Sequence, residues 1–97
     1  MNMNKPHRKD GYEKIAELFK IMANAKRLEI LETIKDKEVT VNEISKVLGI
    51  LKSNTSQHLA LLRYTGIVTA NRKGKNIFYS IKDKNVSKLL SSITLNK

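Results

Sequence analysis

The sequence of 97 residues contains no cysteine. A disulfide framework, a thiolate metal site and a thiol redox switch are therefore excluded. The sequence also lacks an apolar run long enough to cross a bilayer, and its basic N-terminus is not followed by the apolar segment of a secretory signal. We therefore expect a cytoplasmic protein that has no membrane partner.

Acidic residues are missing from the middle of the chain. Between Ile44 and Lys82 there is no Asp or Glu, whereas seven Lys and Arg side chains occur there. Residues 1–43 hold nine basic and eight acidic residues, so most of the net charge of +10 belongs to this acid-free segment, 44–82. A surface of one sign is typical of proteins that bind nucleic acid.

Groups that enzymes use are scarce. The chain has two histidines and no glycine-rich phosphate loop. Glu29 and Glu32 share one helix face, but the flanking Arg27 and Lys35 favour a solvated ion-pair face. His58 precedes a leucine expected in the core, which favours a hydrogen-bonded structural role over a metal ligand. We therefore expect no enzymatic activity, no metal site and no cofactor.

Two short helices joined by a tight turn are predicted within residues 44–68. Ile44, Val47 and Leu48 recur at the spacing of a buried helix face, and Gly49 permits the left-handed residue that commonly ends a helix. The second helix divides into two faces. Thr55, His58, Leu59 and Leu62 are expected to face a core, and Lys52, Ser53, Ser56, Gln57 and Ala60 to face outward.

The outward face of this second helix carries hydroxyls and one amide but no acid. Such groups read base edges in a major groove, where a carboxylate would be repelled by the phosphates. The pattern is typical of a helix-turn-helix that binds DNA. An ordinary helical hairpin with a solvated polar face is the alternative, and the acid-free surroundings favour DNA binding.

Polar residues are placed to cap the other helices. Asn24 is a predicted N-cap for a helix that reaches about Lys35. Thr40 and Glu43 form a T-x-x-E capping box, which starts the first helix of the helix-turn-helix. Asp83 can cap a last helix.

The first and last predicted helices carry apolar stripes at helical spacing. The first helix, which we expect from Tyr12, uses its stripe either for the core or for subunit contact. The stripe of the last helix has little to pack on within one chain, so a partner subunit is its natural cover. The two stripes are Ile15, Leu18, Phe19 and Met22, and Val86, Leu89, Leu90 and Ile93.

A β-hairpin is predicted after Gly66, with strands at 67–70 and 77–81 and a turn at Lys73-Gly74. The run 39–41 could add a short third strand. A hairpin that follows a helix-turn-helix is a wing. Its tip is placed to contact DNA phosphates, which contribute affinity rather than sequence choice, and a solubilising turn is the weaker alternative. The basic residues at the tip are Arg72, Lys73 and Lys75.

Three blocks of the sequence resemble the ArsR/SmtB family of winged-helix repressors. LFKIMANAKRLEIL (18–31) is similar to the family's LFKALADPTRLRIL, and SNTSQHLALLRYTGIV (53–68) to its SQSTVSQHLKVLREAGLV. NRKGKNIFYSI (71–81) is similar to the family wing, RREGRWVYYSL. The resemblance implies a homodimer that meets through its first and last helices, binds an imperfect palindrome in double-stranded DNA and blocks transcription. It implies base-reading positions at Lys52, Ser53, Ser56 and Gln57.

Leu51 departs from the family pattern, which usually has a serine N-cap at this position. The start of the second motif helix can therefore shift to Ser53 or Asn54. In that case Asn54 and Gln57 would form an N-x-x-Q box of their own. Asn54 joins the DNA-binding candidates for this reason, and the roles of Lys52 and Ser53 depend on where the helix begins.

The metal-ligand motifs that recur in the family are missing here. A Cys-x-Cys pair would fall on Thr40 and Asn42, and an Asp-x-His…His set would fall on Asp83, Asn85 and Asn96. A neutral amide is a poor substitute for imidazole at a zinc or nickel site. We therefore predict a regulator that responds neither to metals nor to thiol chemistry. Any effector would be a partner protein or a ligand that the sequence does not identify.

The length predicts a single small domain. We expect a disordered basic tail at residues 1–10 and a winged helix-turn-helix domain for DNA binding and dimerisation at residues 11–97. This domain would be mainly α, with about five helices and a β-hairpin wing. The rival functions are an architectural protein that coats DNA with little sequence preference, and a protein-interaction module that kept the fold.

Overall fold

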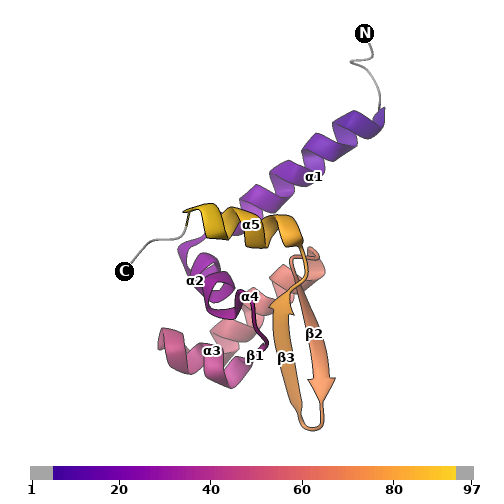
Figure 1. Ribbon diagram of the computed structural model, residues 1–97. Helices are drawn as coiled ribbons and strands as arrows, with labels where there is room; N and C mark the ends of the chain where they lie inside the picture. Colours follow the sequence, from indigo (N-terminus) through magenta and orange to yellow (C-terminus); the bar gives the residue numbers. More distant parts are fainter. Residues whose placement is uncertain (1–5, 94–97) are drawn as a thin grey trace.

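Five helices and three short strands follow one another along residues 6–93, the part of the chain that the computed structural model describes (Figure 1). Side chains are described for residues 11–93. The architecture is the predicted winged helix-turn-helix. The elements are α1 (Pro6–Met22), α2 (Ala25–Ile34), β1 (Val39–Thr40), α3 (Val41–Leu48), α4 (Lys52–Tyr64), β2 (Val68–Lys73), β3 (Asn76–Ile81) and α5 (Lys84–Ile93).

Helix α1 begins at Pro6, six residues before the expected start at Tyr12. Residues 6–10 are therefore helical and do not belong to a disordered tail, and residues 1–5 lie outside the described part. Proline suits a first helical turn because its fixed φ matches the helix and the missing N–H would have no intrahelical partner there.

No helix within residues 6–93 meets the length and apolarity needed to span a membrane.

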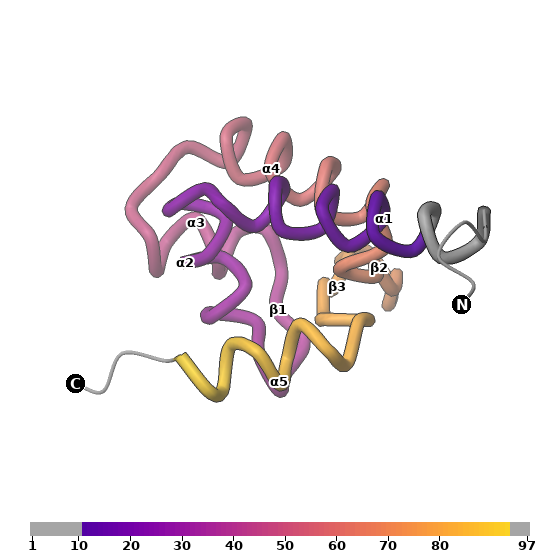
Figure 2. Tube along the Cα trace, turned by 90° about the horizontal axis from the view of Figure 1, so that it is seen from above, coloured from indigo at the N-terminus to yellow at the C-terminus, as the bar shows by residue number. Residues whose placement is uncertain are grey.

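Helix α1 projects away from the rest of the molecule in Figure 1, and in Figure 2, seen from above, it runs over the body of the molecule. The radius of gyration is 15.1 Å, whereas a compact chain of this length has about 13 Å. Arg27 holds the end of α1 against α2, because its Nε donates a 2.7 Å hydrogen bond to the carbonyl oxygen of Ile21. Residues 12–17 are all exposed, so this part of α1 has no cover from its own chain.

The predicted caps of α2 and α3 are confirmed. The Asn24 side chain accepts a 3.0 Å hydrogen bond from the backbone N–H of Arg27. The Thr40 hydroxyl accepts from the Glu43 N–H at 3.2 Å, and the Glu43 carboxylate accepts from the Thr40 N–H at 2.9 Å. The backbone hydrogen bond from Thr40 lowers the pKa of Glu43 below its usual value, and the Thr40 hydroxyl adds to this effect.

The core lies between α2, α3, α4, α5 and the base of the sheet. Most residues predicted for it are buried, but Val47 is 68% exposed and was wrongly assigned to the core face of α3. Three residues predicted for a subunit interface are also buried within the protomer, and these are Met22, Val86 and Leu90. The other buried apolar residues are Ile21, Ile30, Leu31, Ile34, Val39, Ile44, Leu59, Leu62, Ile67 and Val68.

The sheet has the strand order β1-β3-β2, with both pairs antiparallel. The run 39–41, which could add a short third strand, forms β1 with its residues 39–40, and Val39 is paired with Tyr79. Lys73 is paired with Asn76, so the turn of the wing is Gly74-Lys75, one residue later than predicted. Gly74 has a φ of +64°, a left-handed conformation that glycine adopts without a steric penalty.

One buried hydrogen bond joins the two helices of the helix-turn-helix. The Ser45 hydroxyl of α3 donates to the Thr55 hydroxyl of α4 at 2.8 Å, and both residues are buried. The Thr55 hydroxyl in turn donates to the carbonyl oxygen of Leu51 at 3.3 Å. Both hydroxyls are satisfied, and the buried Ser45 hydroxyl depends on Thr55 for its acceptor.

Replacing Thr55 with valine should therefore destabilise the protein. The substitution keeps the shape of the side chain but leaves the buried Ser45 hydroxyl without its acceptor, a loss of about 1–3 kcal/mol. The measurement is the free energy of unfolding in denaturant at a fixed protein concentration.

The double variant Ser45→Ala, Thr55→Val removes both polar groups and should recover part of this loss. The matched control is Thr69→Val, on an exposed threonine of β2. Equal losses for Thr55→Val and Thr69→Val would contradict a structural role for the buried pair.

Candidate nucleic-acid interface

Helix α4 is fixed by one face and exposes the other. Thr55, Leu59 and Leu62 are each 0% exposed and hold the helix against α3 and the sheet. All five predicted reading residues lie on its exposed surface: Lys52, Ser53, Asn54, Ser56 and Gln57. Their positions along one accessible helix match what a helix inserted into a major groove requires.

Helix α4 begins at Lys52, so the possible shift of its start to Ser53 or Asn54 does not occur. Leu51 takes the N-cap position with extended backbone and provides no side-chain cap. Asn54 lies inside the first turn, so it does not start a capping box with Gln57. Both side chains therefore remain available on the surface of the helix.

The wing carries its basic residues on β2 and at the turn. Arg72 and Lys75 are exposed, and no ion pair involves either of them within residues 11–93. Lys73 differs, because its ammonium donates a hydrogen bond to the Glu38 carboxylate and lies 5.4 Å from the centre of the Phe78 ring. Lys73 is therefore paired with a carboxylate of its own chain, whereas, in the described part of the chain, Arg72 and Lys75 are not.

Glu38 is the residue at the wing that sequence reasoning missed. It precedes β1, and the pairing of β1 with β3 brings it beside the hairpin. The hydrogen bond from Lys73 lowers the pKa of Glu38, and the positive charge of Lys73 and a hydrogen bond from Asn71 act in the same direction. The possible strand at 39–41 could have indicated the contact of Glu38 with the wing, because it places residue 38 beside the sheet.

His58 does not have the expected hydrogen-bonded role. Its imidazole is half-buried, and no hydrogen bond to it is found within the described side chains, 11–93. Burial lowers the pKa of His58, and the nearby charges of Arg27 and Lys26 lower it further. Burial and these two charges therefore both favour the neutral form of the ring. The acids of α2 form the expected solvated pairs, although Glu29 is paired with Lys26 and not with Arg27.

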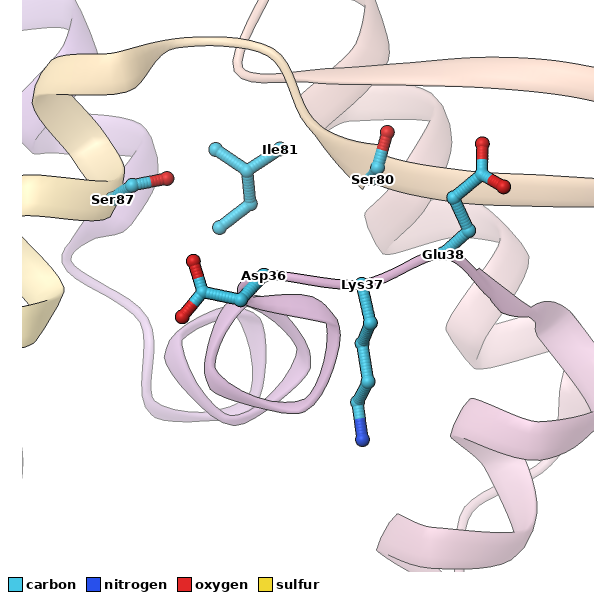
Figure 3. Close-up of a pocket in the computed structure, with 6 residues that line it drawn as sticks. All are labelled: Asp36, Lys37, Glu38, Ser80, Ile81 and Ser87. Carbon is cyan, nitrogen blue, oxygen red and sulfur yellow. The ribbon is translucent and has the colours of Figure 1, made fainter.

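A hollow of about 280 Å³ lies between the α2–β1 connection, the end of β3 and α5 (Figure 3). The Asp36 carboxylate lies on the side of Ser87, whereas Lys37 extends away from the hollow. Glu38 also lines it but is engaged by Lys73. Within the described part of the chain, no group of three or more histidine, aspartate or glutamate side chains is arranged to hold a metal ion.

Comparison with known proteins identifies relatives over almost the whole chain. Residues 24–70 match the profile of the family described as "Bacterial regulatory protein, arsR family". The transcriptional activator HlyU of Vibrio cholerae is 35% identical over 91% of this chain and 82% of its own length. The HTH-type transcriptional regulator KmtR of Mycobacterium tuberculosis is 34% identical over 84% of this chain, which spans 63% of KmtR.

A solved structure shows the same architecture. The winged helix-turn-helix DNA-binding domain Mb0332 of Mycobacterium bovis, described as homodimeric and as a possible ArsR-family regulator, superposes with a TM-score of 0.85. It is 27% identical, and the match covers 96% of this chain and 86% of that domain. The sequence and the fold therefore point to the same group of proteins.

The pairing of Lys73 leads to different expectations for the cations of the wing. A lysine that contacts a phosphate releases a counterion, so Lys75→Ala should flatten the slope of log affinity against log salt by about 0.9. Lys73→Ala should change this slope less, because Lys73 is already paired with Glu38. Glu38→Gln should steepen the slope, because it frees Lys73. The measurement is a DNA titration at several salt concentrations.

The control for the wing variants is Lys88→Ala, on an exposed lysine of α5. Its slope should equal that of the unchanged protein. An unchanged slope for Lys75→Ala would mean that this lysine only solubilises the turn.

Proposed function

This chain belongs to the arsR family of bacterial regulatory proteins and is a DNA-binding transcriptional regulator, not an enzyme; we propose that it is a homodimeric repressor that binds an imperfect palindrome. The observation that carries the proposal is the exposed polar face of α4 beside a basic wing, within a segment free of acids. We further propose that its affinity for DNA does not respond to metals or oxidants.

Helix α4 supplies the sequence reading in this proposal. Gln57 and Ser56 lie on its exposed face, and an amide can form two hydrogen bonds with an adenine edge in the major groove. The wing strands of six residues each extend beside the helix, so Arg72 and Lys75 can contact phosphates of the flanking backbone. Helix α4 is thus proposed to read the base sequence, and the wing is proposed to bind the phosphates.

Dimerisation is supported by the uncovered face of α1. Tyr12, Ile15 and Phe19 lie at i, i+3 and i+7 and are 66%, 49% and 52% exposed. Three large apolar side chains on one face of a projecting helix favour an interface with a second subunit. Ile93 at the end of α5 is 58% exposed and is proposed to join them. The half-buried Leu18 and Leu89 complete the proposed surface.

In this proposal, binding of the dimer to the promoter is sufficient for repression. Two reading helices related by a two-fold axis would engage half-sites about 34 Å apart, one turn of DNA, on the same side of the duplex. A dimer bound over a promoter excludes the polymerase and needs no additional contact surface. Activation by recruitment of the polymerase would require such a surface, so repression is the simpler proposal even though the relative HlyU is named an activator.

The experiment that tests the proposed function is the selection of binding sites from random DNA by the purified protein. A symmetric motif shared by the selected sequences is expected. A pool without a motif would instead indicate an architectural protein that coats DNA, and a lack of any DNA affinity would indicate an interaction module.

Gln57→Ala should reduce the affinity for the selected site and leave the affinity for unrelated DNA nearly unchanged. A bidentate contact with a base contributes about 1–3 kcal/mol of discrimination, and its loss does not alter phosphate contacts. Binding titrations with both DNAs measure the two affinities. Asn85→Ala, on an exposed amide of α5, is the control. Parallel loss on both DNAs would show that Gln57 does not read sequence.

Phe19→Asp should convert the dimer into a monomer at micromolar concentration. The side chain is half-exposed in the protomer, so a charge there disrupts a subunit contact without entering the core. Leu90 is unsuitable for this test because it is 4% exposed, and a charge there would unfold the protomer. Analytical ultracentrifugation measures the mass, and circular dichroism verifies the fold.

Tyr64→Asp is the matched control for dimerisation. Tyr64 is an aromatic residue on α4 that is 90% exposed and lies outside the proposed surface. This variant should remain a dimer. A monomeric unmodified protein, or a dimeric Phe19→Asp variant, would overturn the proposed interface.

Zinc, nickel, arsenite and oxidants at micromolar concentration should not release the protein from its selected site. The Thr40 hydroxyl is used in the capping box, and the Asp83 carboxylate accepts a 2.9 Å hydrogen bond from the Asn85 N–H at the start of α5. Both positions therefore have structural roles. A DNA titration with each agent is the measurement, and a loss of affinity that a chelator reverses would refute the prediction.

A further inference from the structure

Leu51 is unfavourable for stability in two ways, through its exposure and through its position at the start of α4. It is a large apolar side chain that is 69% exposed, so it contributes little to the core. It also takes the N-cap position of α4 without providing a cap, whereas serine, threonine, asparagine or aspartate there would stabilise the helix. A residue that is unfavourable for both burial and capping is expected at a functional position.

The surroundings of Leu51 favour DNA as its contact. It immediately precedes Lys52 and Ser53, which are exposed at the start of the reading helix. Leu51 also lies within the acid-free segment, where the nearest charged residues along the chain, Lys46 and Lys52, are both basic. In Figure 1 the α3–α4 connection lies away from α5 and from the projecting part of α1. The side chain is therefore part of the proposed DNA surface and not of the proposed subunit interface.

The major groove offers one apolar group to such a side chain, the C5-methyl group of thymine. A leucine at the N-terminal end of a reading helix cannot form hydrogen bonds with base edges, but it can remove this methyl group from water. Cytosine and uracil lack the methyl group, so the contact would distinguish thymine from both of them.

We propose that Leu51 is a specificity-determining residue that contacts the methyl group of a thymine in each half-site. The inference rests on the proposed sequence-specific function and adds one base preference that the polar residues of α4 do not supply. It also accounts for the missing serine cap, because a short polar side chain cannot make this apolar contact.

The test uses the selected DNA site with single thymines replaced by deoxyuridine, which removes only the methyl group. Loss of one buried methyl group should weaken binding of the unchanged protein about three- to fivefold at one thymine per half-site. Leu51→Ala removes the contact in both half-sites of the dimer, so it should bind the normal site more weakly by the square of this factor, about ten- to twenty-fivefold. It should no longer distinguish thymine from deoxyuridine at that position.

Two further variants separate the base contact from a structural effect. Leu51→Ser restores a cap, so it should raise the melting temperature while losing the preference for thymine. Val47→Ala removes another exposed apolar side chain, 68% exposed on α3, and should retain the full preference. A rise in stability together with a loss of discrimination is not expected from a purely structural role.

These experiments distinguish a failure of the Leu51 contact from a failure of the proposed function. A selected motif whose thymines all tolerate deoxyuridine would overturn the role of Leu51 and leave the proposed function intact. Retention of the thymine preference by Leu51→Ala, or its loss in Val47→Ala, would also overturn it. A pool without any shared motif would overturn both this inference and the proposed function.

Discussion

The hydrogen bond between the hydroxyls of Ser45 and Thr55 determines how the two helices of the DNA-binding motif meet. The proposed role of α4 requires that its exposed face is held at a fixed angle, and apolar contacts alone tolerate sliding and rotation. A buried polar pair does not, because a displacement leaves the Ser45 hydroxyl without its acceptor in a place that water does not reach. The position of Gln57 on the surface therefore depends on an interaction on the opposite side of the same helix.

The wing depends on a second interaction between distant parts of the chain. Glu38 enters through β1 and binds Lys73, which also lies over the ring of Phe78. An acid at this place would reduce the affinity of the proposed DNA surface for phosphate, but it orients one lysine. Among the described side chains, Arg72 and Lys75 remain without an ion pair. Exposed ion pairs contribute little to stability, so we attribute to this pair an effect on the shape and charge of the wing and not on folding.

Most of the fold could be predicted from the sequence because its signals are local. Capping residues, helical spacing and the glycine of the hairpin turn act within a few residues, and they identified the helices and the wing. The environment of a single apolar residue could not be predicted in this way. Val47, Met22 and Leu90 fit apolar stripes equally well whether they face a core, a partner or solvent, and only the packing of distant elements decides between these environments. Periodicity identified Thr55 as buried but could not reveal that Ser45 is its partner, nor that Lys73 is paired with an acid 35 residues away.

The central claim is that two copies of α4 read two halves of one site while the wings hold the flanking backbone. Hydroxyl-radical footprinting of the protein on its selected DNA tests this claim most directly. The account predicts two protected regions on one face of the duplex, with centres one helical turn apart, and additional protection of the flanking backbone that weakens in the Lys75→Ala variant. A single protected half-site, or uniform protection along the DNA, would contradict it.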